Sequence, residues 1–246
     1  MAAAEDLRAA YKQGWLCLFV GAGVSQSCRL PDWKELAKGV IDRTVWRYKK
    51  TDKPLMPILL KKTLDADFPL LSMRFARQQL GKNFMSTVSE ALYSSKVIES
   101  DTLRAIVGMS KVRMICCFNF DDVLEHAFEK GKRQFKSVTE GEEIPFLSSD
   151  TVIFHPHGYL PRRGRSYARR SRDIVLSEDD YHSLYSSPYS WANIVQLFLL
   201  LGHVALFVGC SLTDPNLRRL LDLVVKVRPS HTHYAFLPDP LWPEAH

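Results

Sequence analysis

The sequence contains no C-x-x-C pair, and its five cysteines show none of the spacings of a disulfide framework or a structural zinc site. Cys17, Cys116, Cys117 and Cys210 lie in or beside apolar runs, where a thiol packs as a small hydrophobic side chain. An odd number of cysteines without framework spacing favours a reducing compartment. We therefore expect a cytoplasmic protein that holds no metal.

Long apolar segments are also missing. The N-terminal residues 1–15 are polar and helical in pattern, unlike a signal peptide. The longest apolar stretch, Ile194 to Cys210, is interrupted by Gln196, Gly202 and His203, which divides it into two elements. We expect no association with a membrane.

No strong excess of one charge is present. Lys and Arg number 33 against 27 Asp and Glu, a net charge of +6 that suits an anionic ligand such as a nucleotide but is too diffuse to require a nucleic acid. Six arginines cluster at 161–172, where a solvated loop is the simplest interpretation because Tyr167 is the one interleaved aromatic residue. We expect no direct binding of nucleic acid.

Apolar runs alternate with helical patterns along the 246 residues, and the 46% apolar share excludes a disordered chain. Continuous apolar runs are typical of strands buried on both faces of a parallel sheet. They lie at 15–20, 112–118, 151–158, 203–209 and 232–238. Residues 46–110 are helical and amphipathic instead. The sequence predicts a single α/β domain over 1–246, with a Rossmann-like, mostly parallel sheet flanked by helices and a helical insertion at about 46–110.

Four predicted strand ends carry unusual residues, at 21–25, 118–122, 155–158 and 209–216. In an open parallel sheet, ligands bind beyond the carboxyl ends of the strands. Glycines directly after a buried strand allow close backbone approach, and their N–H groups can hold a diphosphate. The usual dinucleotide fingerprint has a third glycine where this chain has Gln26, so a tight turn without a ligand is the alternative.

The polar residues at the other ends also have two interpretations. Asn119 could cap a helix, and Asp214 before Pro215 could begin the last helix. His155 and His157 could ligate a metal, but no third ligand recurs nearby at a suitable spacing. A lone histidine at a strand end is often a hydrogen-bonded structural residue.

Taken together and in this order, the four sites resemble the sirtuin family, and more closely its divergent bacterial defence branch, the sirtuin-like NAD glycohydrolases. The resemblance spans about residues 10–238. The matching segments are Gly21-Ala22-Gly23-Val24-Ser25, Pro31-Asp32-Trp33, Asn119-Phe120-Asp121, His157-Gly158 and Gly209-Cys210-Ser211. The extension Ser-Leu-Thr-Asp-Pro-Asn-Leu-Arg after Cys210 is similar to the defence branch rather than to the deacetylases.

Departures from the deacetylases are informative. No cysteine lies between Cys117 and Cys210, so the family's zinc ribbon is missing. The usual Phe-Arg after Pro-Asp is Trp33-Lys34, and Phe118 stands where deacetylases have Gln. Because a core without the ribbon has lost part of the wall that holds an acyl-lysine peptide, water is the expected acceptor.

The resemblance implies NAD as substrate, with no metal cofactor, and roles for particular residues. Asn119 would orient the ribose hydroxyls or the attacking water, and His157 would be the general base. Gly21–Ser25 would hold the diphosphate, Ser211 with the Gly209 backbone the adenosine side, and Asp121 would position Asn119 or contact nicotinamide. The residues expected to bind NAD are Gly21, Ala22, Gly23, Ser25, Pro31, Asp32, Trp33, Asp121, Gly209, Ser211 and Asp214.

The expected function is therefore NAD⁺ hydrolysis to nicotinamide and ADP-ribose, as the NAD-depleting effector of an anti-phage, abortive-infection system. Two alternatives stay open: a NAD-dependent protein deacylase or ADP-ribosyltransferase, and a non-catalytic sensor of NAD or ADP-ribose. Since an unregulated hydrolase would deplete its own cell, we expect a homo-oligomer, or a sensor domain or subunit as partner. Candidate surfaces are the insertion at about 46–110 and the apolar helix at 191–201. We expect the chain to be a domain of a longer protein or a subunit of a complex.

Overall fold

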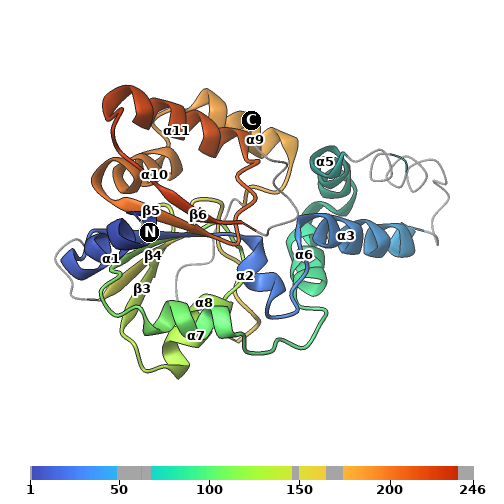
Figure 1. Ribbon diagram of the computed structural model, residues 1–246. Coiled ribbons are helices and arrows are strands. Elements are labelled where there is room, and N and C mark those ends of the chain that lie inside the picture. The colour runs from blue at the N-terminus through green and yellow to red at the C-terminus, as the bar shows by residue number, and fades with distance from the viewer. Residues whose placement is uncertain (1, 49–61, 63–67, 146–149, 165–173, 238–246) are drawn as a thin grey trace.

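A parallel sheet with helices on both faces forms the body of the protein, and a helical lobe extends to one side (Figure 1). The computed structural model describes residues 2–48, 62, 68–145, 150–164 and 174–237. The arginine-rich segment 161–172 therefore lies for the most part outside the described residues.

The sheet has six described strands in the order β3-β4-β2-β1-β5-β6, and every neighbouring pair is parallel. The strands are β1 (Leu16–Val20), β2 (Met114–Cys117), β3 (Phe135–Val138), β4 (Thr151–Phe154), β5 (Val204–Val208) and β6 (Tyr234–Phe236). This confirms the predicted α/β fold with a parallel sheet flanked by helices.

The central strand β1 shows why its sequence lacks an alternating pattern. Leu16, Leu18 and Val20 join the core on one face of the sheet, and Cys17 and Phe19 join the core on the other face. All five side chains are buried. A strand covered on both faces has no solvent side and therefore reads as a continuous apolar run.

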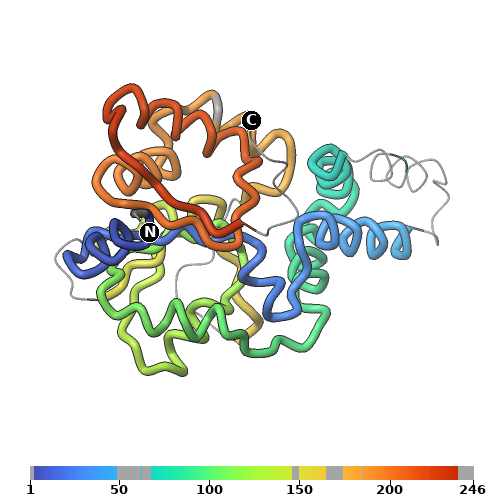
Figure 2. The backbone as a smooth tube through the Cα atoms, viewed as in Figure 1, coloured from blue at the N-terminus to red at the C-terminus, as the bar shows by residue number. Residues whose placement is uncertain are grey.

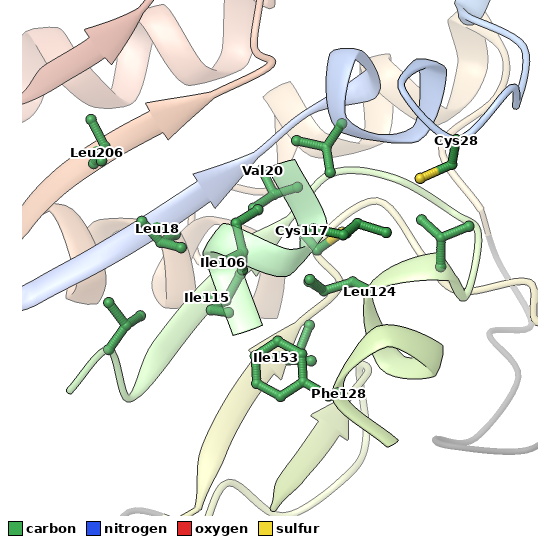
Figure 3. Packing of buried hydrophobic residues seen from close by; sticks show 14 of the residues in the cluster. Leu18, Val20, Cys28, Ile106, Ile115, Cys117, Leu124, Phe128, Ile153 and Leu206 are labelled. Carbon is green, nitrogen blue, oxygen red and sulfur yellow. The ribbon is translucent and has the colours of Figure 1, made fainter. Parts of the chain in front are cut away.

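Two helical layers cover the sheet. One layer contains α1 (Ala2–Gln13), α7 (Asp101–Gly108) and α8 (Val123–Lys130). Figure 3 shows Ile106 of α7 and Leu124 and Phe128 of α8 near the strand residues Ile115 and Ile153. The other layer contains α10 (Trp191–Gly202) and α11 (Pro215–Val227), which pack on each other and on the opposite face.

The helical lobe has a hydrophobic core of its own. The lobe consists of α3 (Trp33–Tyr48), α5 (Pro69–Leu80), the short 3₁₀ turn Gly81–Asn83 and α6 (Phe84–Leu92). Figure 2 shows how far the lobe projects from the sheet. In the described parts of 46–110 there is no strand. Residues 49–61 and 63–67 lie outside the described residues. That the range 46–110 is an insertion into the fold stays a prediction.

Local signals for helix starts agree with the structure. The Asp32 carboxylate accepts a hydrogen bond from the Glu35 N–H at 2.7 Å, and the Glu35 carboxylate accepts one from the Asp32 N–H at 3.0 Å, so the two residues form a capping box at the start of α3. Ser177 caps α9 (Glu178–Ser186) in the same reciprocal way with Asp180. Two elements without a sequence prediction are β3 and the five-residue helix α2 (Ala22–Gln26). Among the described helices, none is both long and apolar enough to span a membrane.

Candidate active site

The four unusual strand ends lie side by side at one edge of the sheet. They follow β4, β2, β1 and β5, which are consecutive in the strand order and run in the same direction. The chain moves from β1 to β2 on one side and later to β5 on the other, so the strand order reverses at β1. Such a switch point is where ligands bind in open α/β sheets.

The glycines after β1 and β5 pack directly against each other. The Gly21 N–H donates to Val208 O at 3.0 Å and the Gly23 N–H to Gly209 O at 2.9 Å. A Cβ on Gly21 would lie 2.6 Å from Gly209 O, and a Cβ on Gly209, whose φ is +66°, would lie 2.6 Å from Val24 N. Glycine is therefore required here for the close approach of the two loops, and a role in holding a diphosphate stays a prediction.

A chain of hydrogen bonds fixes the side chain of Asn119. Its amide nitrogen donates to Gly21 O at 2.9 Å and to Ser25 Oγ at 2.8 Å. The Ser25 hydroxyl in turn donates to Asp121 Oδ2 at 2.6 Å. The amide oxygen of Asn119 has no hydrogen-bond partner among the described residues, and the residue is 8% exposed. The amide is thus held from its nitrogen side while its oxygen stays available.

Asp121 ends this chain in a buried position. Burial raises the pKa of its carboxyl to about 6, although hydrogen bonds from Ser25 and from the Val123 N–H oppose that shift. The Ser25 hydroxyl and the Asp121 carboxylate are both used within the protein. Ser25 thus connects Asp121 to the amide of Asn119, and both roles expected for Asp121 stay predictions.

His157 follows β4 and lies beside two aromatic side chains and one acidic side chain. Its ring centroid is 4.9 Å from that of Phe118 and 6.1 Å from that of Tyr181, and its Nε2 lies 3.8 Å from Asp214 Oδ2. Burial lowers the pKa of His157, and the negative charge of Asp214 partly counteracts this. The imidazole is therefore neutral at neutral pH and able to accept a proton.

Asp214 begins the last helix, as one interpretation of its sequence predicted, and its expected contact with NAD stays a prediction. Its Oδ1 accepts a hydrogen bond from the Leu217 N–H at 2.9 Å, so it caps α11 with Pro215 in the first turn. Its Oδ2 faces His157 and accepts a hydrogen bond from the Tyr181 hydroxyl at 3.0 Å. Tyr181 of α9 had no sequence signal for the site, because nothing in a helix start shows which distant loop it meets.

The second histidine of the pair, His155, has a different environment. Its Nε2 lies 2.7 Å from Glu125 Oε1, and both side chains are 0% exposed. The Ser137 hydroxyl also donates to Glu125 Oε1, at 2.7 Å. Within the described part of the chain, no group of three or more His, Cys, Asp or Glu side chains could hold a metal ion.

The remaining predicted residues lie around this edge. Asp32 caps α3 and accepts a hydrogen bond at 3.4 Å from Gln26 of α2, and Pro31 precedes it in the connection between the two helices. Trp33 packs against the core of the helical lobe. Ala22 is exposed at the start of α2, and Ser211 is exposed with its hydroxyl 2.7 Å from that of Thr213.

Comparison with known proteins agrees with this arrangement. The chain is 23% identical over 233 residues to Defense-associated sirtuin 2 of Bacillus subtilis, covering 94% of this chain and 21% of that protein. It is 20% identical over 216 residues to the NAD(+) hydrolase ThsA of Enterococcus faecium, covering 87% of this chain and 40% of that protein. It thus spans well under half the length of either relative. The model of the SIR2-like domain family matches residues 113–246, more than half of the chain, and the chain therefore belongs to the SIR2-like domain family.

Proposed function

We propose that this protein hydrolyses NAD⁺ to nicotinamide and ADP-ribose. The observation that carries the proposal is the placement of Asn119 and His157 at the ends of the neighbouring strands β2 and β4, beside the packed glycine loops of β1 and β5. Members of SIR2-like families use NAD, and one relative is named an NAD(+) hydrolase.

The reaction breaks the bond between the nicotinamide nitrogen and the ribose C1′. Nicotinamide leaves as a neutral molecule with the bonding electrons, and the ribose passes through an oxocarbenium-like state. A water oxygen then forms the new bond to C1′ and loses a proton. The protein must therefore fix the ribose, place the water and accept that proton.

His157 is the proposed proton acceptor. Its imidazole is neutral at neutral pH because burial lowers its pKa, and it makes no hydrogen bond with another described residue that would occupy a ring nitrogen. The proton reaches it from water directly or through a ribose hydroxyl. Asp214, 3.8 Å away, stabilises the imidazolium that forms.

Asn119 is the proposed orienting group. Because its amide nitrogen is bound to Gly21 O and Ser25 Oγ, its oxygen has a fixed direction and can accept a hydrogen bond from the water or a ribose hydroxyl. Asp121 acts through Ser25 to hold this orientation. A preformed acceptor of this kind needs no reorganisation during the reaction.

The remaining contacts to NAD are assigned by resemblance. The loop Gly21–Ser25 lies next to the diphosphate, and Ser211 with the Gly209 backbone lies on the adenosine side. Asp32 and Trp33 border the site where the helical lobe joins the sheet. No metal ion takes part.

The biological role that we propose is NAD depletion in anti-phage defence. One relative is named a defence-associated sirtuin, and the other carries the name of an NAD(+) hydrolase. Because such an enzyme is toxic to its own cell, its activity should depend on assembly with further copies or with a sensor domain or subunit. Helix α10 offers a surface for this, since Ile194 and Phe198, one turn apart, are 53% and 41% exposed.

The test is to incubate the purified protein with NAD and to quantify nicotinamide and ADP-ribose over a range of protein concentrations. We expect both products in equal amounts without any added peptide, and a specific activity that rises as the protein assembles. Asn119→Ala and His157→Ala should each lose about 100-fold or more in rate. Near-wild-type hydrolysis by both variants would refute the assignment, and binding of NAD without products would favour a sensor.

A further inference from the structure

Helix α9 brings a tyrosine to the candidate base. We infer that Tyr181 is a positioning residue, which holds the Asp214 carboxylate and thereby sets how strongly that carboxylate favours the protonated form of His157. The inference rests on the proposed function, because it concerns the residue that accepts the proton there. Tyr181, from the separate helix α9, thus joins the pair formed by His157 after β4 and Asp214 at the start of α11.

The geometry places Tyr181 and His157 on the same carboxylate oxygen. The Tyr181 hydroxyl donates to Asp214 Oδ2 at 3.0 Å, and His157 Nε2 lies 3.8 Å from that atom. The other oxygen, Oδ1, accepts the Leu217 N–H at 2.9 Å. With both oxygens bound, the carboxylate cannot turn, and the tyrosine neutralises part of the charge that would otherwise act on His157.

A residue of the helical lobe holds the helix turn that contains Tyr181. Arg77 of α5 forms two parallel hydrogen bonds with the neighbouring residue Asp180, at 2.7 and 2.8 Å, and a third with Ile174 O at 3.3 Å. Asp180 also accepts hydrogen bonds from Ser177, the cap of α9. The first turn of α9 is therefore fixed to α5, and Tyr181 is part of that turn.

Among the described residues, side chains from three elements face the imidazole of His157, and they determine the sign of the effect. Phe118 after β2 has no charge, Tyr181 of α9 carries a neutral hydroxyl, and Asp214 of α11 is the charged group among these contacts. Removing the Tyr181 hydroxyl removes the hydrogen bond that partly neutralises the Asp214 carboxylate, so the negative charge of Asp214 acts more strongly on His157. The imidazolium is then favoured, so the pKa of His157 rises and the base is protonated at a higher pH.

The experiment uses three matched variants. Tyr181→Phe removes only the hydroxyl, Asp214→Asn removes the charge while keeping a residue that caps helices well, and Tyr189→Phe removes the hydroxyl of an exposed tyrosine after α9. The pKa of His157 is measured in each by NMR on protein labelled at histidine, with the signal assigned by its loss in His157→Gln. The pH dependence of kcat/KM for NAD is measured in parallel.

We expect Tyr181→Phe to raise the pKa of His157 by about half a unit or more and Asp214→Asn to lower it, with Tyr189→Phe unchanged. The acidic limb of the pH profile of kcat/KM should move to higher pH in Tyr181→Phe and to lower pH in Asp214→Asn. A His157 pKa in Tyr181→Phe equal to that of the wild type would overturn the inference, even if activity fell, because a merely structural role would lower activity alone. If the wild type releases no nicotinamide, the proposed function fails, and the NMR titration still decides the role of Tyr181.

Discussion

The imidazole Nδ1 of His155 lies 3.3 Å from the main-chain oxygen of Asn119. A buried histidine at the end of β4 thereby contacts the backbone of the residue that supplies the site's amide at the end of β2. The opposite ring nitrogen is held by Glu125 of α8. The two histidines of His-Pro-His therefore have separate roles. His155 supports the loop that carries Asn119, and His157 faces the candidate site.

The first prediction concerns this support. His155→Ala should destabilise the protein by about 3 kcal/mol or more, because among the described residues it leaves the Ser137 hydroxyl as the one partner of the buried Glu125 carboxylate. Adding Glu125→Gln to that variant should recover part of the loss, since the unpaired buried charge is removed. Unfolding in urea measures both changes. Losses that simply add in the double variant would contradict this account of the pair.

The second prediction is a pH dependence that comes from Asp121. Burial raises its pKa in the folded protein from 3.8 to about 6, so the folded state binds more protons than the unfolded state between these values. Stability from this group is full below pH 4 and declines as the pH rises toward 6. The free energy of unfolding of Asp121→Asn minus that of the wild type should therefore increase by up to about 3 kcal/mol from pH 4 to pH 7.

Urea unfolding at several pH values measures this difference, and Asp222→Asn is the matched control because Asp222 is exposed on α11. Its difference from the wild type should stay constant over the same range. A constant difference for Asp121→Asn as well would show that the buried carboxyl is not the source.

The third prediction separates backbone strain from steric conflict. Gly14 and Gly209 both have positive φ, at +75° and +66°, but a Cβ on Gly14 would meet no atom within 4 Å. Gly14→Ala should cost about 1–2 kcal/mol from the left-handed conformation alone. Gly209→Ala should cost clearly more, since its Cβ would collide with the backbone of Gly23 and Val24. Equal losses in thermal unfolding would mean that the two glycine loops are not as closely packed as described.

Sequence patterns predicted the strands that are continuous apolar runs, including β6, which is a largely exposed edge strand. The five apolar runs correspond to β1, β2, β4, β5 and β6. The strand β3 could not be found in this way because it is a four-residue edge strand, with Lys136 exposed and Phe135 half-buried. What makes it a strand is its pairing with β4, which is a tertiary contact rather than a local preference.

The site was predictable only as far as strand ends reveal it. Asn119 and His157 each follow an apolar run, and parallel strands bring such residues to one edge. Only the family resemblance singled out His157, because residue patterns do not show the environments of the two histidines, which depend on Asp214 and Glu125 from two different helices. Tyr181 could not be predicted as a site residue, because its role also depends on a contact between distant parts of the chain. Its partner Asp214 lies 33 residues further along the chain.

The last prediction concerns the connection between the helical lobe and α9. Arg77 and Arg74 both extend from α5 toward the acidic first turn of α9, but the carboxylates they bind differ in burial, since Asp180 is less exposed than Glu178 and Asp179. Arg77 binds Asp180 through two short hydrogen bonds and lies 5.0 Å above the Phe84 ring, whereas Arg74 forms exposed ion pairs with Glu178 and Asp179. Arg77→Ala should therefore cost about 1 kcal/mol or more, and Arg74→Ala should cost less than about 0.5 kcal/mol.

The effect of Arg77→Ala should also depend on pH. Burial alone would raise the pKa of Asp180, but hydrogen bonds from Arg77, Leu176 and Ser177 outweigh burial and lower it. A carboxyl with a lowered folded-state pKa stabilises the protein above its unfolded-state pKa, and this stabilisation is lost as the pH falls through the folded-state value. The loss caused by Arg77→Ala should thus be full at pH 7 and shrink below about pH 4. Amide hydrogen exchange along α9 should accelerate in this variant and not in Arg74→Ala. Equal acceleration in both variants would show that α9 is held by general charge attraction to α5 and not by the Arg77–Asp180 pair.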